Sequence, residues 1–194
     1  MKLALFASGN GSNVQAILEA VKIGMLQAEI VGLVCDNPAA FVIERAQNAG
    51  IETFVLSPKQ CANKQAWEEQ VVTFLQEKGT ELVVLAGFMR IVGPTLLEAF
   101  PQRITNIHPS LLPNFPGKSG IQDAFDAKVS QTGVTIHWVD AGVDTGPIIR
   151  QETLNIDPNW TLEQLETRIH AIEHRLYPET LQQIIETFNK GVDS

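Results

Sequence analysis

The segment Asn106-Ile107-His108-Pro109 brings an amide and an imidazole to the end of an apolar stretch. If residues 105–108 form a strand, alternation directs the side chains of Asn106 and His108 to the same face. Pro109 holds His108 in an extended conformation, which fixes the imidazole at the strand end. This pair suits acyl-type transfer, in which an oxyanion develops and a proton moves. A structural, hydrogen-bonded histidine explains the same pattern.

A loop further along the chain supplies a carboxylate for this pair. Asp144 lies in the sequence Asp-Thr-Gly-Pro, and Asp140 precedes it as a rival for the same role. Either carboxylate, brought to the strand end, would favour the protonated form of the His108 imidazole. The chemistry needs no serine or cysteine nucleophile if the attacking amine belongs to the substrate. His137 lies within a predicted strand and is interpreted as structural.

Residues 8–13 (SGNGSN) connect the first predicted strand to the first predicted helix. Their glycines let the backbone approach an anion, and a helix N-terminus adds free N–H groups and positive potential. A tight turn in which Ser12 or Asn13 caps the helix is the alternative to a phosphate site. The dinucleotide-binding motif would need glycine at Val14, but Asp36, at the place of a ribose-binding acid, keeps a nicotinamide-dependent reductase open.

Two further segments carry candidate binding residues. Residues 87–92 (GFMRIV) follow a strongly apolar strand, where ligands of open α/β sheets bind. Met89, Ile91 and Val92 there suit either a slot for a flat heteroaromatic ring or ordinary core packing. Residues 170–174 (HAIEH) match an inverted zinc-peptidase motif. No second acidic ligand is identifiable downstream, so we expect no metal.

Strands alternating with helices predict a mostly parallel sheet that is completed by an antiparallel pair. Expected strands are Lys2–Ala7, Glu29–Cys35, Glu52–Leu56, Glu81–Ala86, Ile104–His108, Gly133–Val139 and Pro147–Glu152. Expected helices are Val14–Val21, Ala39–Ala49, Lys64–Lys78, Pro94–Phe100 and Leu162–Lys190, the last with a candidate break at Pro178. The fold class expected is therefore α/β.

Composition limits the function classes. The chain has 194 residues, 44% of them hydrophobic, which fits one globular domain. Its net charge of −8 argues against non-specific binding of nucleic acid or anionic membranes, although a small anionic substrate is not excluded. Cys35 and Cys61 lack metal or disulfide spacing and are expected as free thiols. No apolar run is long enough to span a bilayer, and a cytoplasmic location is expected.

Taken together, the motifs resemble one family, the folate-dependent glycinamide ribonucleotide formyltransferases of purine synthesis. The order and spacing of the matching segments are specific, and they cover nearly the whole chain. These segments are Ser8–Asn13, Leu85–Ile91, Asn106–Pro113, Asp144–Pro147, and Glu173-His174 with Tyr177-Pro178. The resemblance implies a Rossmann-like fold and formyl transfer from 10-formyltetrahydrofolate, the co-substrate, to the amine of glycinamide ribonucleotide. It also favours Asp144 over Asp140, making Asn106, His108 and Asp144 the expected catalytic trio.

The resemblance also assigns the binding residues. It places the phosphoribosyl end of the substrate on Gly11, Ser12 and Asn13, and the glycinamide against Glu173. The folate is expected against Asn106 and a run of loop residues, and its anionic end near two cations. That run is Met89, Arg90, Ile91 and Val92, and the two cations are Arg90 and Lys64. Arginine is the usual residue at the Lys64 position, and residues 118–121 depart from some family members.

The resemblance implies a single formyltransferase domain over residues 1–194. Residues 1–100 are expected to form its phosphate-binding half and residues 101–194 its catalytic and folate-binding half. The expected partners are small molecules only, with a monomer or a weak homodimer. Methionyl-tRNA formyltransferase and formyltetrahydrofolate deformylase have extra domains for which this chain has no room. A deformylase-like hydrolase, the reductase and a non-catalytic phosphosugar-binding module remain the alternatives.

Overall fold

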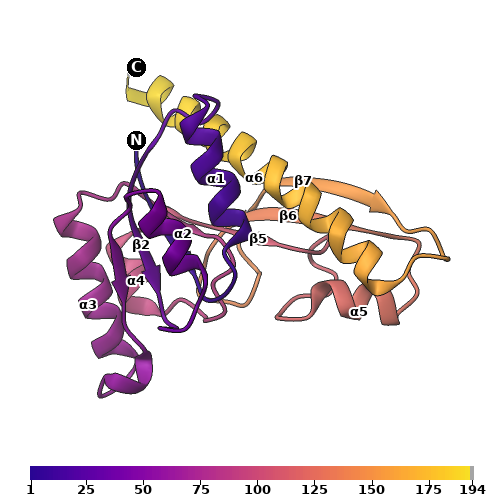
Figure 1. Cartoon of the computed structure of the whole chain (residues 1–194), viewed down its shortest axis with the longest axis horizontal. Helices are drawn as coiled ribbons and strands as arrows, with labels where there is room; N and C mark the ends of the chain where they lie inside the picture. Colours follow the sequence, from indigo (N-terminus) through magenta and orange to yellow (C-terminus); the bar gives the residue numbers. More distant parts are fainter. Residues whose placement is uncertain (193–194) are drawn as a thin grey trace.

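The computed structural model describes residues 1–192, so residues 193–194 of the expected domain lie outside the described part. A seven-stranded sheet runs in the order β3-β2-β1-β4-β5-β6-β7 (Figure 1). β1 to β5 are parallel, β6 is antiparallel to β5, and β7 is antiparallel to β6. The strands are β1 Lys2–Ala7, β2 Glu29–Cys35, β3 Thr53–Val55, β4 Leu82–Leu85, β5 Ile104–His108, β6 Gln131–Trp138 and β7 Ile148–Asn155. The expected mixed, mostly parallel α/β sheet is confirmed.

Helices cover both faces of the sheet and bury the central strand, β1, on both sides. Leu3 and Leu5 of β1 pack toward α1 and α6, while Ala4 and Phe6 pack toward α3 and α4. One face carries α1 Ser12–Lys22, α2 Val42–Asn48, α5 Gly120–Asp126 and α6 Leu162–Val192. The other carries α3 Lys64–Glu77 and α4 Pro94–Ala99, and a short 3₁₀ turn, Pro58–Gln60, precedes α3.

The strand order places a crevice at the centre of the sheet. From β1 the chain builds β2 and β3 on one side, and then crosses to build β4 and β5 on the other. Open sheets bind ligands where such a reversal occurs, beyond the carboxyl ends of the strands. Ser8 leaves β1 and Gly87 leaves β4 at this point, and the Ser8 N–H donates to the Gly87 carbonyl at 3.0 Å. The two loops that start here are therefore neighbours.

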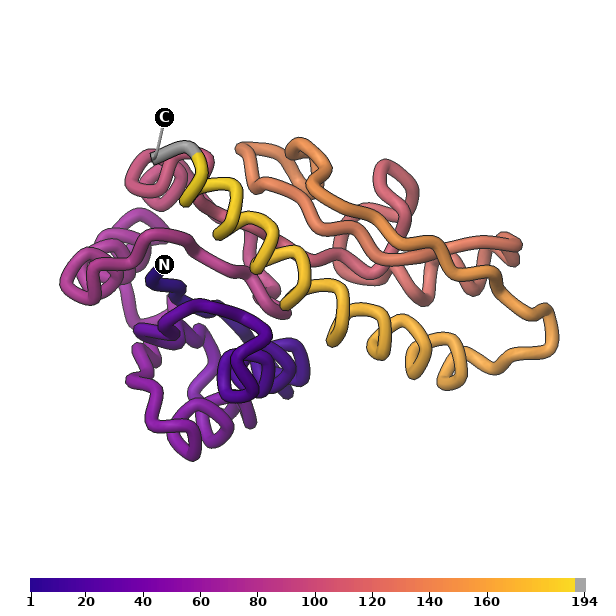
Figure 2. The backbone as a smooth tube through the Cα atoms, turned by 90° about the horizontal axis from the view of Figure 1, so that it is seen from above, coloured from indigo at the N-terminus to yellow at the C-terminus, as the bar shows by residue number. Residues whose placement is uncertain are grey.

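Helix α6 ties the two halves of the sheet together, running from the far end of β6 and β7 back to the N-terminal half (Figure 2). Its Tyr177 is fully buried, donates to the Leu85 carbonyl at 3.0 Å and lies 3.1 Å from the Thr105 hydroxyl. Burial raises the pKa of the Tyr177 phenol, which therefore stays neutral. The candidate break at Pro178 is wrong: the helix is continuous, because a long buried face offsets the lost hydrogen bond.

Several element boundaries differ from the sequence prediction, by up to three residues: β6 begins at Gln131 rather than Gly133, and β7 ends at Asn155 rather than Glu152. Helix α1 begins at Ser12 after Gly11, without a side-chain cap, so capping by Ser12 or Asn13 is wrong. Helix α2 begins at Val42 rather than Ala39, since the Asn37 side chain accepts the Ala39 N–H and makes a turn. Helix α5 was not expected, because it is short and begins with glycine. No helix among residues 1–192 has the length and apolar character of a membrane span.

Candidate active site

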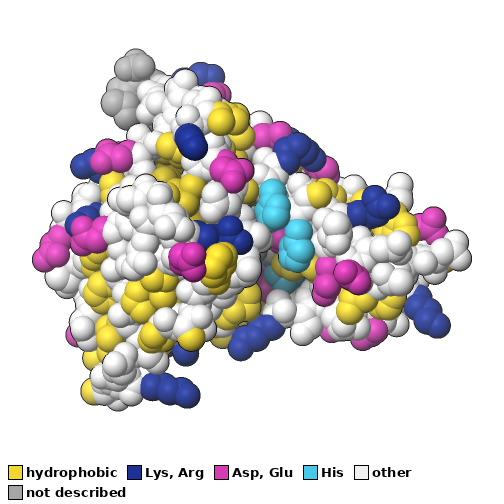
Figure 3. All heavy atoms as spheres, viewed as in Figure 1, with side chains coloured by type: hydrophobic (Ala, Val, Ile, Leu, Met, Phe, Trp, Pro, Cys, Tyr) yellow, Lys and Arg dark blue, Asp and Glu magenta, His cyan; other side chains and the backbone are white. Residues whose placement is uncertain are grey.

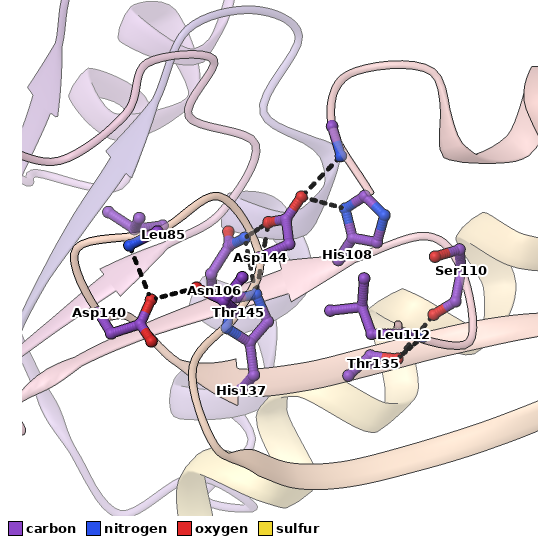
Figure 4. Close-up of polar contacts among 12 residues, drawn as sticks. Leu85, Asn106, His108, Ser110, Leu112, Thr135, His137, Asp140, Asp144 and Thr145 are labelled. Atoms are coloured by element: carbon purple, nitrogen blue, oxygen red, sulfur yellow. Dashed lines mark hydrogen bonds and ion pairs between the residues drawn. The ribbon is translucent and has the colours of Figure 1, made fainter. Parts of the chain in front are cut away.

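The residues expected to do chemistry meet at the carboxyl end of β5 (Figure 4). Asn106 and His108 leave the same face of β5 and converge on Asp144, in the loop between β6 and β7. Asp144 Oδ1 lies 3.5 Å from Asn106 Nδ2, and Asp144 Oδ2 lies 3.5 Å from His108 Nδ1. All three line a cavity of about 370 Å³, hereafter the first cavity. The structure thus brings the expected trio together.

The His108 ring is held in one orientation. Its side chain is 4% exposed, and its Nε2–H donates to the Phe115 carbonyl at 2.7 Å. That bond leaves Nδ1 facing Asp144 and the first cavity. Both ring nitrogens therefore face oxygen acceptors, an arrangement that suits the imidazolium. The 3.5 Å gap to the carboxylate leaves the Nδ1–H available to a ligand atom.

His137, interpreted from the sequence as structural, belongs to the site. Antiparallel pairing places it opposite Asn106, and its side chain is 2% exposed. Its Nδ1–H donates to the Trp138 carbonyl at 2.8 Å, so Nε2 faces the Asn106 amide at 3.3 Å. The same Nε2 lies 3.6 Å from Asp144 Oδ1. Only the register of β5 against β6 could have revealed this, and no local sequence signal sets that register.

Asp144 is the electrostatic centre of the trio. Burial opposes ionisation of its carboxyl, but the neighbouring His137 and His108 imidazoles and the hydrogen bond from the Gly117 N–H outweigh burial. The pKa of Asp144 therefore lies below its usual range. The Gly117 N–H contributes a bond of 2.8 Å. Asp140 does not reach the imidazoles and binds Thr145 and Gly142 within its own loop.

A second cavity, of about 790 Å³, lies beside residues 8–13 and α6. Gly11, Ser12 and Asn13 line it at the uncapped N-terminus of α1, where the first N–H groups lack helical partners. Glu173, 4% exposed, reaches this loop from α6 and accepts a hydrogen bond from Asn13 Nδ2 at 3.3 Å. The four residues expected to bind the ribonucleotide thus share one cavity, with N–H groups and a carboxylate on opposite sides.

The residues of the zinc-peptidase pattern in α6 contact one another directly. His170 Nδ1 contacts Glu173 Oε2 at 2.8 Å, and the His174 ring stacks on His170. The bond to Glu173 raises the pKa of His170, whereas burial lowers the pKa of His174. Over residues 1–192, no three His, Cys, Asp or Glu side chains are arranged to hold a metal ion.

The loop after β4 lines the first cavity, and it does so with the expected residues, Met89, Arg90, Ile91 and Val92. Met89 and Ile91 are 54% and 56% exposed, an apolar surface that a flat ligand ring would cover. The Arg90 Nε–H donates to Asp36 Oδ2, and the Asp36 side chain is buried, which limits the access of a ribose to that carboxylate. Lys64 lines a third, adjoining cavity together with Met89 and Ile91.

The three cavities form one continuous hollow. Met89 and Lys118 line all of them, one from the loop after β4 and the other from the loop after β5. Histidine side chains, cyan in Figure 3, gather in the hollow between the N-terminal half and the β6–β7 half. Asn106, His108 and Asp144 line the first cavity, beside Ile107 and Pro109, which also line the second.

Comparisons of the sequence and the fold with known proteins assign the chain to a family. A family model described as "Formyl transferase" matches residues 1–181. Phosphoribosylglycinamide formyltransferase of Bacillus subtilis is 48% identical over 190 residues, 98% of this chain and 97% of that relative. The crystal structure of phosphoribosylglycinamide formyltransferase from Bacillus halodurans matches with a TM-score of 0.93 and 52% identity, covering 95% of both chains.

A longer relative matches the same fold. The trifunctional purine biosynthetic protein adenosine-3 of Chironomus tentans is 38% identical over 94% of this chain and 14% of its own length. The resemblance expected from the sequence motifs is thereby confirmed, together with the fold that it implied. The chain belongs to the formyl transferase family.

Proposed function

We propose that this chain transfers a formyl group from 10-formyltetrahydrofolate to the amine of glycinamide ribonucleotide, in de novo purine biosynthesis. The observation that carries the proposal is the convergence of Asn106, His108 and Asp144 in the first cavity, beside Ile107 and Pro109, which line both the first and the second cavity. The family and the names of relatives that cover almost the whole chain support the same reaction. No metal takes part in the proposed chemistry.

The acceptor binds in the second cavity. The N–H groups of Gly11, Ser12 and Asn13 hold its phosphate, because the uncapped helix end offers donors and positive potential. Glu173 holds the glycinamide part from the facing helix. Backbone recognition of this kind lets a chain of net charge −8 bind an anion. The acceptor amine then reaches the trio from the side of the phosphate loop.

The donor binds in the first cavity, with its pteridine ring against residues 89–92. Met89 and Ile91 supply apolar contact, while backbone groups of the loop and Asn106 supply polar contacts. Arg90 and Lys64 lie toward the third cavity, where we place the anionic end of the folate. Binding both substrates in one hollow supplies proximity, which turns a bimolecular step into an intramolecular one.

The trio acts on the formyl group. The neutral amine attacks the formyl carbon, and the bond from that carbon to N10 of the folate breaks. Asn106 and His108 donate hydrogen bonds to the formyl oxygen as negative charge develops, and one such preorganised donor contributes about 3 kcal/mol. Asp144 stabilises the imidazolium of His108. The amine loses a proton that Asp144 relays through water, and N10 gains one, releasing tetrahydrofolate.

We further propose that residues 1–194 act as one formyltransferase domain, in the cytoplasm, as a monomer or a weak homodimer. The substrates are small molecules, and neither nucleic acid nor a membrane takes part. The two halves of the domain contribute differently, since residues 1–100 carry the phosphate loop and residues 101–194 the trio. Residues 89–92 of the first half complete the folate cavity.

A comparison of the parent with His108→Ala tests the proposed reaction. Formation of tetrahydrofolate, followed by absorbance, should require both substrates in the parent. In the variant we expect kcat to fall roughly 100- to 1,000-fold. Calorimetry with glycinamide ribonucleotide should show similar affinity for both proteins, because His108 lies outside the phosphate site. Unequal affinity would mean that the variant lost its fold or its acceptor site.

The alternatives give different outcomes in the same assay. Folate release without the ribonucleotide would identify a deformylase-like hydrolase. Ribonucleotide binding without turnover, unchanged by His108→Ala, would identify a phosphosugar-binding module. The reductase is disfavoured before any assay, because Asp36, the residue that would bind the cofactor ribose, is buried beside Arg90.

A further inference from the structure

The loop between β6 and β7 holds Asp144 in an unusual backbone conformation. Its φ is 54°, in the left-handed region that residues other than glycine rarely adopt. Aspartate tolerates this region better than most side chains, but at some cost in energy. The conformation matters because it turns the carboxylate toward His108 and His137, at 3.5 and 3.6 Å. Something in the loop must therefore hold it.

A side-chain hydrogen bond closes this loop on the side away from the imidazoles (Figure 4). The Thr145 hydroxyl donates to Asp140 Oδ1 at 2.7 Å, and the Gly142 N–H donates to the same oxygen at 3.0 Å. Asp140 thus joins the residue directly after Asp144 to the start of the loop. Rotation of the Asp144 backbone would have to break this bond or move Thr145.

Close packing leaves the loop little freedom. A Cβ atom on Gly142 would lie 2.0 Å from the Thr145 hydroxyl oxygen, and one on Gly146 would lie 1.8 Å from the Trp138 carbonyl. The Trp138 N–H donates to the Pro147 carbonyl at 2.9 Å and joins the two ends. Backbone contacts therefore hold the loop at its base, and the hydrogen bond between Thr145 and Asp140 holds its middle.

We propose that Asp140 and Thr145 are positioning residues, whose hydrogen bond holds the Asp144 carboxylate between the two catalytic-site imidazoles. Neither residue needs to touch a substrate for this role. The rival carboxylate of the sequence analysis thereby gains a function of its own. The expected change in kcat rests on the proposed formyl transfer, whereas the expected position of the Asp144 carboxylate does not.

Thr145→Val and Thr145→Ser form a matched pair that tests the proposal. Valine has the shape of threonine without the hydroxyl, and serine keeps the hydroxyl without the methyl group. Carbon-13 NMR titration of the aspartate carboxyls measures the pKa of Asp144 without any substrate. We expect a low pKa in the parent and in Thr145→Ser, and a pKa closer to the ordinary aspartate range in Thr145→Val, because its carboxylate drifts from its neighbours.

Steady-state kinetics add a second readout. In Thr145→Val, kcat should fall about three- to tenfold, the effect of one lost hydrogen bond, with both KM values within about twofold of the parent. Thr145→Ser should regain the parent kcat. Asp140→Ala should lower kcat at least as much, and adding Thr145→Val to it should cause no further loss, since the bond is already absent.

The outcomes separate two failures. An inactive parent, with the expected titrations, would refute the proposed function and leave the positioning role supported. An Asp144 pKa that Thr145→Val does not change would overturn the positioning role, whatever the activity. A serine variant as impaired as the valine variant would also overturn it, because the methyl contact would then be what matters.

Discussion

The two sides of the site are built in different ways. On the acceptor side, residues 8–13 join β1 directly to α1, and a glycine of positive φ opens the helix end. On the donor side, residues 87–93 have no regular structure. Side chains from distant segments accept backbone N–H groups of this loop, whereas Asn37 and Arg45 donate to carbonyls of the acceptor loop. Ser8 accepts the Met89 N–H at 2.9 Å, and the buried Glu68 accepts the Gly93 N–H.

This difference separates binding from chemistry. Backbone N–H groups carry no titratable charge, so their contribution to phosphate binding depends on backbone shape, although His170, Glu173 and His174 of the same cavity are titratable. The donor side and the trio rely on ionised side chains, such as Asp144, whose state and position the protein must control. Variants on the acceptor side should therefore change acceptor binding, and variants of the trio should change turnover and its pH dependence.

Among the comparisons of the two sides, Asp144→Asn should give the largest effect, second only to that of His108→Ala. Asparagine keeps the shape but removes the charge opposite His108, and kcat should fall about 100-fold with little change in the KM for the ribonucleotide. Initial rates at varied concentrations of each substrate measure both quantities. A large rise in the ribonucleotide KM would break the separation of binding from chemistry.

The same variant should change the acid stability of the protein. The pKa of Asp144 is lowered in the folded state, so its contribution to stability is present above the ordinary aspartate range and is lost as the pH falls through the lowered value. Between about pH 5 and pH 3, the free energy of unfolding should therefore fall less in Asp144→Asn than in the parent. Urea titrations at both pH values measure this difference, and equal losses would refute it.

Gly11→Ala should give the largest effect on the acceptor side. Gly11 has a φ of 77°, and an added Cβ would lie 2.2 Å from Val42 Cγ2. The loop must shift, so the KM for the ribonucleotide should rise about tenfold, and the free energy of unfolding should fall by about 1–3 kcal/mol. Kinetics with saturating donor and a urea titration measure the two effects.

Gly24→Ala is the matched control for this change. Gly24 has the same φ of 77°, but its added Cβ would meet nothing within 4 Å, and Gly24 lies outside the site. The control should cost some stability through strain and leave both KM values unchanged. A rise in its ribonucleotide KM would show that loss of stability, rather than loop shape, explains the effect of Gly11→Ala.

The parts of the site that could be predicted from the sequence have local causes. Alternation along β5 puts Asn106 and His108 on one face, and the strand-to-helix turn at Gly11 forms part of the second cavity, where we propose the anion site. Both depend on residues a few positions apart. The alternating α/β pattern likewise predicted the sheet, because each strand and helix carries its own hydrophobic period.

The remaining parts depend on contacts between distant segments. Asn106 and His137 are 31 positions apart, and Arg90 and Asp36 are 54 apart, so only the tertiary fold brings each pair together. The residues themselves also gave no decision between Asp140 and Asp144, since both suit the role in the same loop. The family resemblance favoured Asp144. The structure explains this choice, because Asp144 faces the imidazoles whereas Asp140 forms hydrogen bonds within its own loop.

The smallest expected effect tests the contact between the two sides. Ser8 belongs to the phosphate loop, yet its hydroxyl accepts the Met89 N–H of the donor wall. Ser8→Ala should therefore raise the KM for 10-formyltetrahydrofolate about three- to fivefold and leave the KM for the ribonucleotide within about twofold. Gly11→Ala, in the same loop but away from Met89, should raise the ribonucleotide KM instead. If Ser8→Ala raised both KM values equally, the two loops would move together when this hydrogen bond is lost. The separation of acceptor side from donor side would then not hold for Ser8.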